Sequence, residues 1–234
     1  MEELLLQVQN VTKKFGSKQV LNNISFQLGS GRITGILGSN GSGKSTLMKL
    51  IAGLSRPGSG SIKVLGYPIG VESKAFVSFM PEVPVTESWM NVGDALKFQR
   101  DFYPDFDQAK ALHMLDFMNL RVQDKVKSLS KGLNERLQLT LAFSRRARLY
   151  LLDEPIGGVD PVARNKILNA LMEFYEEDSS ILVSTHLVND IERIFDQVIF
   201  LKNGEIILQH DVEELRLARG KSIDELFREV FAEC

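Results

Sequence analysis

The chain has 234 residues, with 28 lysines and arginines against 30 aspartates and glutamates, so its formal net charge is −2. Hydrophobic residues make up 44% of the sequence, which is typical of a folded globule and excludes an intrinsically disordered chain. A near-neutral balance gives no overall attraction to nucleic acid, and we expect no nucleic-acid partner.

The sequence indicates a cytosolic protein. Its single cysteine, Cys234, allows no internal disulfide, as is typical of a reducing compartment. The N-terminal residues MEELLLQVQN lack the basic region and apolar run of a secretory signal. No stretch reaches the roughly 18 apolar residues of a membrane span. If the protein acts at a membrane, another chain must therefore supply the spans.

Hydrophobic periodicity predicts strands and helices that alternate along most of the chain. Short apolar or alternating runs predict strands at residues 4–8, 24–28, 33–37, 62–65, 76–80, 149–152 and 181–184. Helical spacing predicts helices at residues 47–54, 112–118, 133–141, 161–174 and 187–195. Asp160 followed by Pro161 marks a helix start. This alternation predicts a largely parallel sheet with helices on its faces.

The C-terminal part of the chain predicts a hairpin followed by helices. The hairpin turns at Asn203-Gly204. The patterns Asp211-x-x-Glu214 and Ser222-x-x-Glu225 predict capping boxes at two helix starts. Residues 85–147 read as helical throughout, and the cluster of Arg145, Arg146 and Arg148 is interpreted as solvating a helix end.

Residues 38–46 read GSNGSGKST and match the phosphate-binding pattern G-x-x-x-x-G-K-[ST] between a predicted strand and a predicted helix. Glycines let backbone N–H groups turn toward a phosphate, and the helix N-terminus adds a favourable dipole. We expect Lys44 to reach the β and γ phosphates and the Ser45 hydroxyl to ligate Mg²⁺. The nucleotide-binding residues predicted here are Gly38, Ser39, Asn40, Gly41, Ser42, Gly43, Lys44, Ser45 and Thr46. The motif alone does not choose among kinases, GTPases and motor ATPases.

Two carboxylates, Asp153 and Glu154, follow the apolar run at residues 149–152. A strand of this kind brings Asp153 beside the phosphate loop, where it can hold the hydration shell of Mg²⁺. Glu154 is then placed to polarise an attacking water. The loop and the acidic pair together predict metal-assisted phosphoryl transfer.

The stretch Leu129-Ser130-Lys131-Gly132-Leu133 resembles LSGGQ, the signature of ATP-binding-cassette (ABC) proteins. Ser130 and Gly132 agree with it, whereas Lys131, Leu133 and the following Asn134 depart from it. The resemblance covers nearly the whole chain. Its other motifs, in the order of the family, are Phe15, the phosphate loop, the acidic pair, Gly158-Val159-Asp160 as the D-loop and Ser184-Thr185-His186 as the histidine switch.

The resemblance implies an α/β fold: a P-loop NTPase core, with a mostly parallel sheet flanked by helices, an antiparallel β-subdomain and an inserted α-helical subdomain. We expect one ABC ATPase domain over residues 1–234. Its core and β-subdomain occupy residues 1–84 and 148–210, its helical subdomain 85–147 and its C-terminal helices 211–234.

The resemblance also implies how ATP and Mg²⁺ are held. Phe15 stacks on adenine with Val20 beside it, Glu154 is the general base, and His186 holds the γ phosphate and orients Glu154. Ser130 and Gly132 of a second cassette complete each site, in a homodimer or a heterodimer. Asp160 couples the two sites across the interface.

Two departures from the family concern the site. Glu82 stands after Phe79-Met80-Pro81 where the family usually has Gln, and we expect it to ligate Mg²⁺, although an ionised carboxylate cannot donate as an amide does. The signature LSKGL marks either a site of low activity or, as in a branch of bacterial exporters, a competent one. Because Glu154 and His186 are both present, we favour a competent ATPase.

We therefore expect the motor subunit of an ABC transporter that exports drugs, antibiotics or peptides. It would lie on the cytoplasmic face of the cell membrane and bind a separate permease. Trp89 and Met90 are either helix core or a wall of the groove that receives the permease. The alternatives are a soluble ABC ATPase acting on ribosomes or DNA, and a nucleotide kinase, which would leave the signature unexplained.

Overall fold

The computed structural model describes residues 3–232, so the prediction on Cys234 falls outside the described residues, as do Met1 and Glu2. The strands are β1 (Leu4–Phe15), β2 (Lys18–Gly29), β3 (Ile33–Leu37), β4 (Ser59–Val64), β5 (Tyr67–Pro68), β6 (Val77–Met80), β7 (Leu149–Asp153), β8 (Ser180–Thr185), β9 (Gln197–Lys202) and β10 (Glu205–Asp211). The α-helices are α1 (Lys44–Ile51), α2 (Val71–Lys74), α3 (Val92–Phe102), α4 (Gln108–Phe117), α5 (Lys131–Phe143), α6 (Pro161–Glu173), α7 (Val188–Ile191), α8 (Val212–Arg219) and α9 (Ile223–Phe231).

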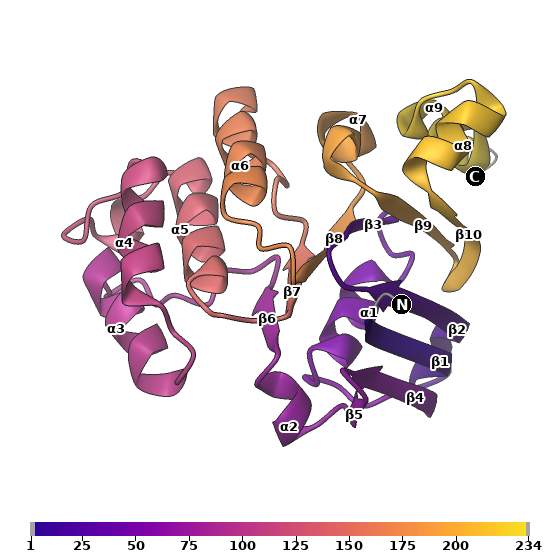
Figure 1. Ribbon diagram of the computed structural model, residues 1–234, viewed down its shortest axis with the longest axis horizontal. Helices are drawn as coiled ribbons and strands as arrows, with labels where there is room; N and C mark the ends of the chain where they lie inside the picture. Colours follow the sequence, from indigo (N-terminus) through magenta and orange to yellow (C-terminus); the bar gives the residue numbers. More distant parts are fainter. Residues whose placement is uncertain (1–2, 233–234) are drawn as a thin grey trace.

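The strands form two sheets. A six-stranded sheet has the order β10-β9-β3-β8-β7-β6 and is parallel except for the β9–β10 hairpin. A four-stranded antiparallel sheet has the order β2-β1-β4-β5. Helices α3, α4 and α5 lie beyond edge strand β6, whereas α8 and α9 lie at the opposite end of the molecule (Figure 1). The predicted α/β fold class is confirmed.

The central strands are buried on both faces, so their alternate residues enter two different cores. Leu149 and Leu151 of β7 join the core shared with α1 and the antiparallel sheet. Tyr150 and Leu152 join the core shared with α3 to α6 and the C-terminal helices. Fully buried parallel strands of this kind appear in the sequence as unbroken apolar runs. Their carboxyl ends are therefore held rigidly from both sides.

The structure corrects the prediction that residues 85–147 are helical throughout. Helices cover 92–102, 108–117 and 131–143, with irregular segments between them. The helix predicted at residues 112–118 begins earlier, at Gln108, and Leu112, the first residue of the predicted range, is exposed. The buried face consists of Ala111, Met114, Leu115 and Met118. These positions follow the i, i+3, i+4, i+7 spacing of a helix face.

The predicted helix ends agree with the structure in part. Asp160 caps α6 by accepting from the N–H groups of Val162 and Ala163, and Pro161 is the first helical residue. Ser222 forms the full capping box with its partner three residues on. Asp211 caps α8 through its own carboxylate only, without the reciprocal half of a box.

Helix α7 is shorter than predicted, because residues 188–191 are helical and the chain then tightens into a 3₁₀ turn over 192–194. No helix within residues 3–232 is long and apolar enough to cross a bilayer.

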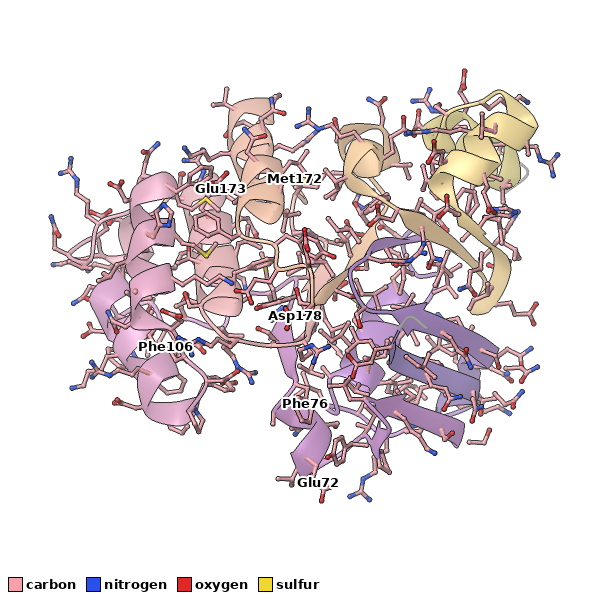
Figure 2. All side chains as sticks on the ribbon, in the orientation of Figure 1. Glu72, Phe76, Phe106, Met172, Glu173 and Asp178 are labelled. Atoms are coloured by element: carbon pink, nitrogen blue, oxygen red, sulfur yellow. The ribbon has the colours of Figure 1, made fainter. Side chains whose placement is uncertain are left out.

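Arg145 does not solvate a helix end, which corrects the interpretation of the arginine cluster. Its side chain is buried and ion-pairs with Asp105, and its guanidinium lies 4.2 Å from the ring centroid of Tyr103. It also donates to the carbonyl of Val77, at 2.6 Å, where β6 begins. Figure 2 labels Phe106, in the α3–α4 connection, and Phe76, just before β6. Arg145 joins these two segments and so ties the helices to the edge of the sheet.

We expect Arg145→Gln to lower the free energy of unfolding by about 3 kcal/mol, because it leaves the half-buried carboxylate of Asp105 and the buried carbonyl of Val77 without their partner. Urea unfolding measures this. Arg146→Gln is the matched control, since its side chain is 71% exposed and its ion pair with Asp107 lies at the surface. Equal losses for the two variants would contradict the role of Arg145.

Candidate nucleotide site

The register of three parallel strands gathers the predicted site at one edge of the sheet. Leu37 at the end of β3 pairs with Thr185 of β8. Asp153 at the end of β7 pairs with Ser184 of β8. The phosphate loop, the acidic pair and the histidine switch each follow one of these strand ends. Segments that are far apart in the sequence therefore meet where ligands bind in open α/β sheets.

The phosphate loop is built for an anion. Gly41 and Gly43 have φ values of 81° and 110°, a backbone region that favours glycine. A Cβ at Gly43 would lie 2.7 Å from Leu21, so a side chain there would also push the loop off β2. Helix α1 begins at Lys44 with no side-chain cap. Its first N–H groups lack intrahelical partners and lie at the positive end of the helix dipole, so they can bind phosphate oxygens.

Lys44 and Glu154 form a buried ion pair at the centre of the site. The Lys44 ammonium lies 3.4 Å from Glu154 Oε1 and donates to the carbonyl of Gly38 at 2.8 Å. His186 Nδ1 lies 3.0 Å from both carboxylate oxygens of Glu154. Thr185 Oγ1 donates to Glu154 Oε2 at 3.2 Å. The residue expected to be the general base is therefore held by three neighbours, and its φ of 53° shows that its backbone is constrained too.

Asp153 and Ser45 provide hard oxygen ligands side by side. Ser45 Oγ donates to Asp153 Oδ1 at 3.1 Å, and Ser184 Oγ forms a very short hydrogen bond to the same oxygen. No cluster of three or more His, Cys, Asp or Glu side chains that could enclose a metal occurs within residues 3–232. This sparse donor set fits Mg²⁺, which takes one or two protein oxygens and completes its shell with phosphates and water.

A cavity of about 1150 Å³ is lined by Lys44, Ser45, Glu154 and His186. Phe15 and Val20 line one end of it, where β1 turns into β2. Glu82, in the segment after β6, also lines the cavity. The predicted adenine residues, most of the phosphate loop and the metal candidates Ser45 and Glu82 therefore share one space. Its lining does not include the predicted residues Gly38, Ser39, Ser42 and Asp153. The residues that line it are Phe15, Lys18, Gln19, Val20, Asn40, Gly41, Gly43, Lys44, Ser45, Thr46, Glu82, Val83, Pro84, Lys131, Glu135, Glu154, Gly157, Gly158, His186 and Asn203.

Ser130, Gly132 and Asp160 are not among those lining residues. Ser130 is the N-cap of α5 and accepts from the N–H of Leu133. A Cβ at Gly132 would lie 3.6 Å from Asp160 Oδ2 and 2.9 Å from Ala163, so the start of α5 packs closely on the start of α6. Ser130, Gly132 and Asp160 thus lie outside the lining of the cavity, whereas Lys131 of the signature and Gly158 of the D-loop belong to it.

The family model described as ABC transporter matches residues 21–157. The chain belongs to the ABC transporter family. The predicted family and the predicted ATPase class are both confirmed.

Two relatives and one solved structure illustrate the match of this cassette. It is 32% identical to the linearmycin resistance ATP-binding protein LnrL of Bacillus subtilis (strain 168), over 87% of the chain and 68% of that protein. It is 33% identical to the Nod factor export ATP-binding protein I of Rhizobium meliloti (strain 1021), over 87% of the chain and 63% of that protein. A structure of the ATP-binding subunit of an ABC transporter is 30% identical, with a TM-score of 0.86, and covers 96% of this chain and 98% of its own.

Three contributors to the cassette's site were missed from the sequence. Ser184 and Thr185 were assigned to the switch motif without roles, although the strand register places their hydroxyls on Asp153 and Glu154. Glu135 was not considered. It could have been found from its spacing, because Glu135 lies four residues before Leu139 on α5 and so shares the buried face of that helix.

Burial raises the pKa of Glu135 from its ordinary value of 4.5 to about 7, with Lys131 lowering it and Glu82 raising it further. Between these two pH values the folded state therefore holds a proton that the unfolded state releases. Stability falls as the pH rises through this range and stays lower above it.

We expect Glu135→Gln to stabilise the cassette at pH 8, by on the order of 2 kcal/mol, and to change little at pH 4.5. Thermal unfolding at the two pH values measures this. Glu229→Gln, an exposed carboxylate on α9, is the control. A larger stabilisation at pH 4.5 than at pH 8 would contradict the burial of an ionisable carboxyl here.

Proposed function

We propose that two such cassettes enclose two ATP molecules and that their hydrolysis drives export through a separate membrane permease. The observation that carries this proposal is the split site. Most of the phosphate loop, Glu154 and His186 line one cavity, and Asp153 accepts from Ser45 of that loop, whereas Ser130, Gly132 and Asp160 lie outside the lining. We infer that these three residues act on the phosphate loop of a second cassette, across an interface.

A two-fold arrangement satisfies both sets of residues at once. Each cassette offers its phosphate loop to one ATP and its signature to the other, which makes the interface isologous if the copies are identical. The triphosphate then lies between Lys44 of one chain and the N-terminus of α5 of the other, and both neutralise its charge. ATP binding thus favours the closed dimer, and loss of phosphate removes that attraction.

Within each site the chain's own residues prepare the attack of water. Glu154 accepts a proton from the water while the water oxygen bonds to the γ phosphorus. The bond between the γ phosphorus and the β–γ bridging oxygen breaks at the same time, and ADP leaves. His186 keeps the carboxylate oriented through the 3.0 Å contact at Nδ1, and Lys44 compensates the charge on the phosphates. When bound, Mg²⁺ would be held by Ser45, Asp153 and Glu82 and would stabilise charge on the phosphate oxygens.

The permease is proposed to bind the groove between β6 and α3. Phe79, Val85 and Tyr103 line it, and Phe102 and Trp89 are exposed nearby in sequence. Trp89 is 73% exposed whereas Met90 is buried, so only Trp89 is available to a partner. Exposed apolar residues gathered in this way are typical of interaction sites. We propose accordingly that the cassette lies at the cytoplasmic face of the membrane, bound to its permease.

Export is proposed from the relatives, one of which is named for linearmycin resistance and another for Nod factor export. The alternative, a soluble ABC ATPase acting on ribosomes or DNA, gains no support from the near-neutral charge of the chain.

We expect Glu154→Gln to reduce ATP turnover by at least 100-fold and to accumulate a dimer that depends on ATP. Size exclusion with and without saturating ATP, beside a phosphate-release assay, tests both. The variant keeps the shape of the side chain, so it removes the base and not the fold. Glu173→Gln on α6 is the control and should behave as the unmodified chain. A Glu154→Gln variant that stays monomeric at saturating ATP, alone and with its permease, would refute the two-cassette mechanism.

A further inference from the structure

The sequence departs from the family at Lys131 in the signature and at Glu82 in the glutamine loop. Both residues line the nucleotide cavity. Glu82, Lys131 and Glu135 all line it, and we call these three residues the rim group. They come from the segment after β6 and from the first and second turns of α5. The catalytic scheme above uses Glu82 only as a metal ligand and gives no role to the other two.

Lys131 is an unusual choice for its position. It is the first residue of α5, where a cation opposes the positive end of the helix dipole. Its ammonium lies against the D-loop, so close to Gly158 that a side chain there would collide with it. No carboxylate forms an ion pair with Lys131 among residues 3–232. Lys131 therefore lines the cavity beside Gly158 with a charge that no carboxylate of the described chain neutralises in an ion pair.

Glu135 is the counterpart on the next turn. It is 7% exposed, and in the part of the chain that the structure describes it has neither a hydrogen bond nor an ion pair. A buried carboxyl without a direct partner depends on the charges around it. The two that act on it most are Lys131, which favours its ionised form, and Glu82, which opposes it. The charges of Lys131 and Glu82 therefore act on Glu135 without a direct contact.

We propose that Lys131 is a positioning residue that offsets the negative charge of Glu82 and Glu135 and thereby lets the cavity accept a nucleoside triphosphate. Replacing the usual Gln by Glu82 adds one negative charge beside the phosphates. Replacing the usual Gly by Lys131 adds the opposite charge at the same edge. The negative charge of Glu82 and the positive charge of Lys131 then compensate each other, and each is tolerated because the other is present. This inference rests on the proposed function, since it concerns the ATP site of the cassette.

A double-mutant cycle tests this compensation. ATP binding to the full chain is measured by isothermal titration calorimetry with Glu154→Gln as the parent, so that hydrolysis does not interfere. We expect Lys131→Gln to raise Kd about 10-fold and Glu82→Gln/Lys131→Gln to return to within about 3-fold of the parent. Lys131→Arg, which keeps the charge, should bind within about 2-fold. Because Lys131 is exposed, these variants should fold, and thermal unfolding checks it.

The same cycle in EDTA separates charge compensation from metal binding. The coupling between Lys131 and Glu82 should persist without Mg²⁺ and weaken as salt is raised. The proposal is overturned if Lys131→Gln binds ATP as the parent does, if the double variant binds as poorly as Lys131→Gln alone, or if the coupling disappears in EDTA. Size exclusion of the parent with ATP reports on the proposed function separately, since a missing dimer leaves the binding comparison intact.

Discussion

The buried ion pair between Lys44 and Glu154 is the interaction on which the rest of the site depends. More than nine-tenths of each side chain is buried, so each charge offsets the cost of burying the other, and Lys44 donates in addition to the carbonyls of Gly38 and Ser39. Lys44 opens α1 at the end of the phosphate loop, and Glu154 follows β7, so the pair fastens the loop to the centre of the sheet. In the proposed mechanism incoming phosphates compete for the same lysine, so nucleotide binding would act directly on the carboxylate proposed as the base.

The two-sided burial of β3, β7 and β8 is what makes such a pair possible. A slip of one residue would send every side chain of these strands into the opposite core, so their register is fixed and their carboxyl ends stay aligned. Under the proposed mechanism this site holds one half of an ATP molecule. Ser130, Gly132 and Asp160, at the starts of α5 and α6, lie outside its lining and would serve a second cassette.

The sequence predicted best what depends on contiguous residues. The phosphate loop, the acidic pair after β7 and the Asp160 cap are local patterns with local physical causes, and the alternation of strands and helices predicted the α/β class but not the strand order. Packing between distant segments was not predictable. Arg145 reads as one of several surface arginines until the contacts with Asp105 and Val77 are seen. The relation of Lys131 to Glu82 likewise joins positions that no local pattern links.

The central claim, that the signature of one chain completes the phosphate site of another, is tested most directly by cross-linking. In a Cys234→Ser, Glu154→Gln background, Ser39→Cys marks the phosphate loop and Ser130→Cys marks the signature. Both serines are exposed. A short bis-maleimide should link two chains when ATP and Mg²⁺ are present and each chain carries both cysteines. An equal yield without nucleotide, or no covalent dimer with it, would contradict the account.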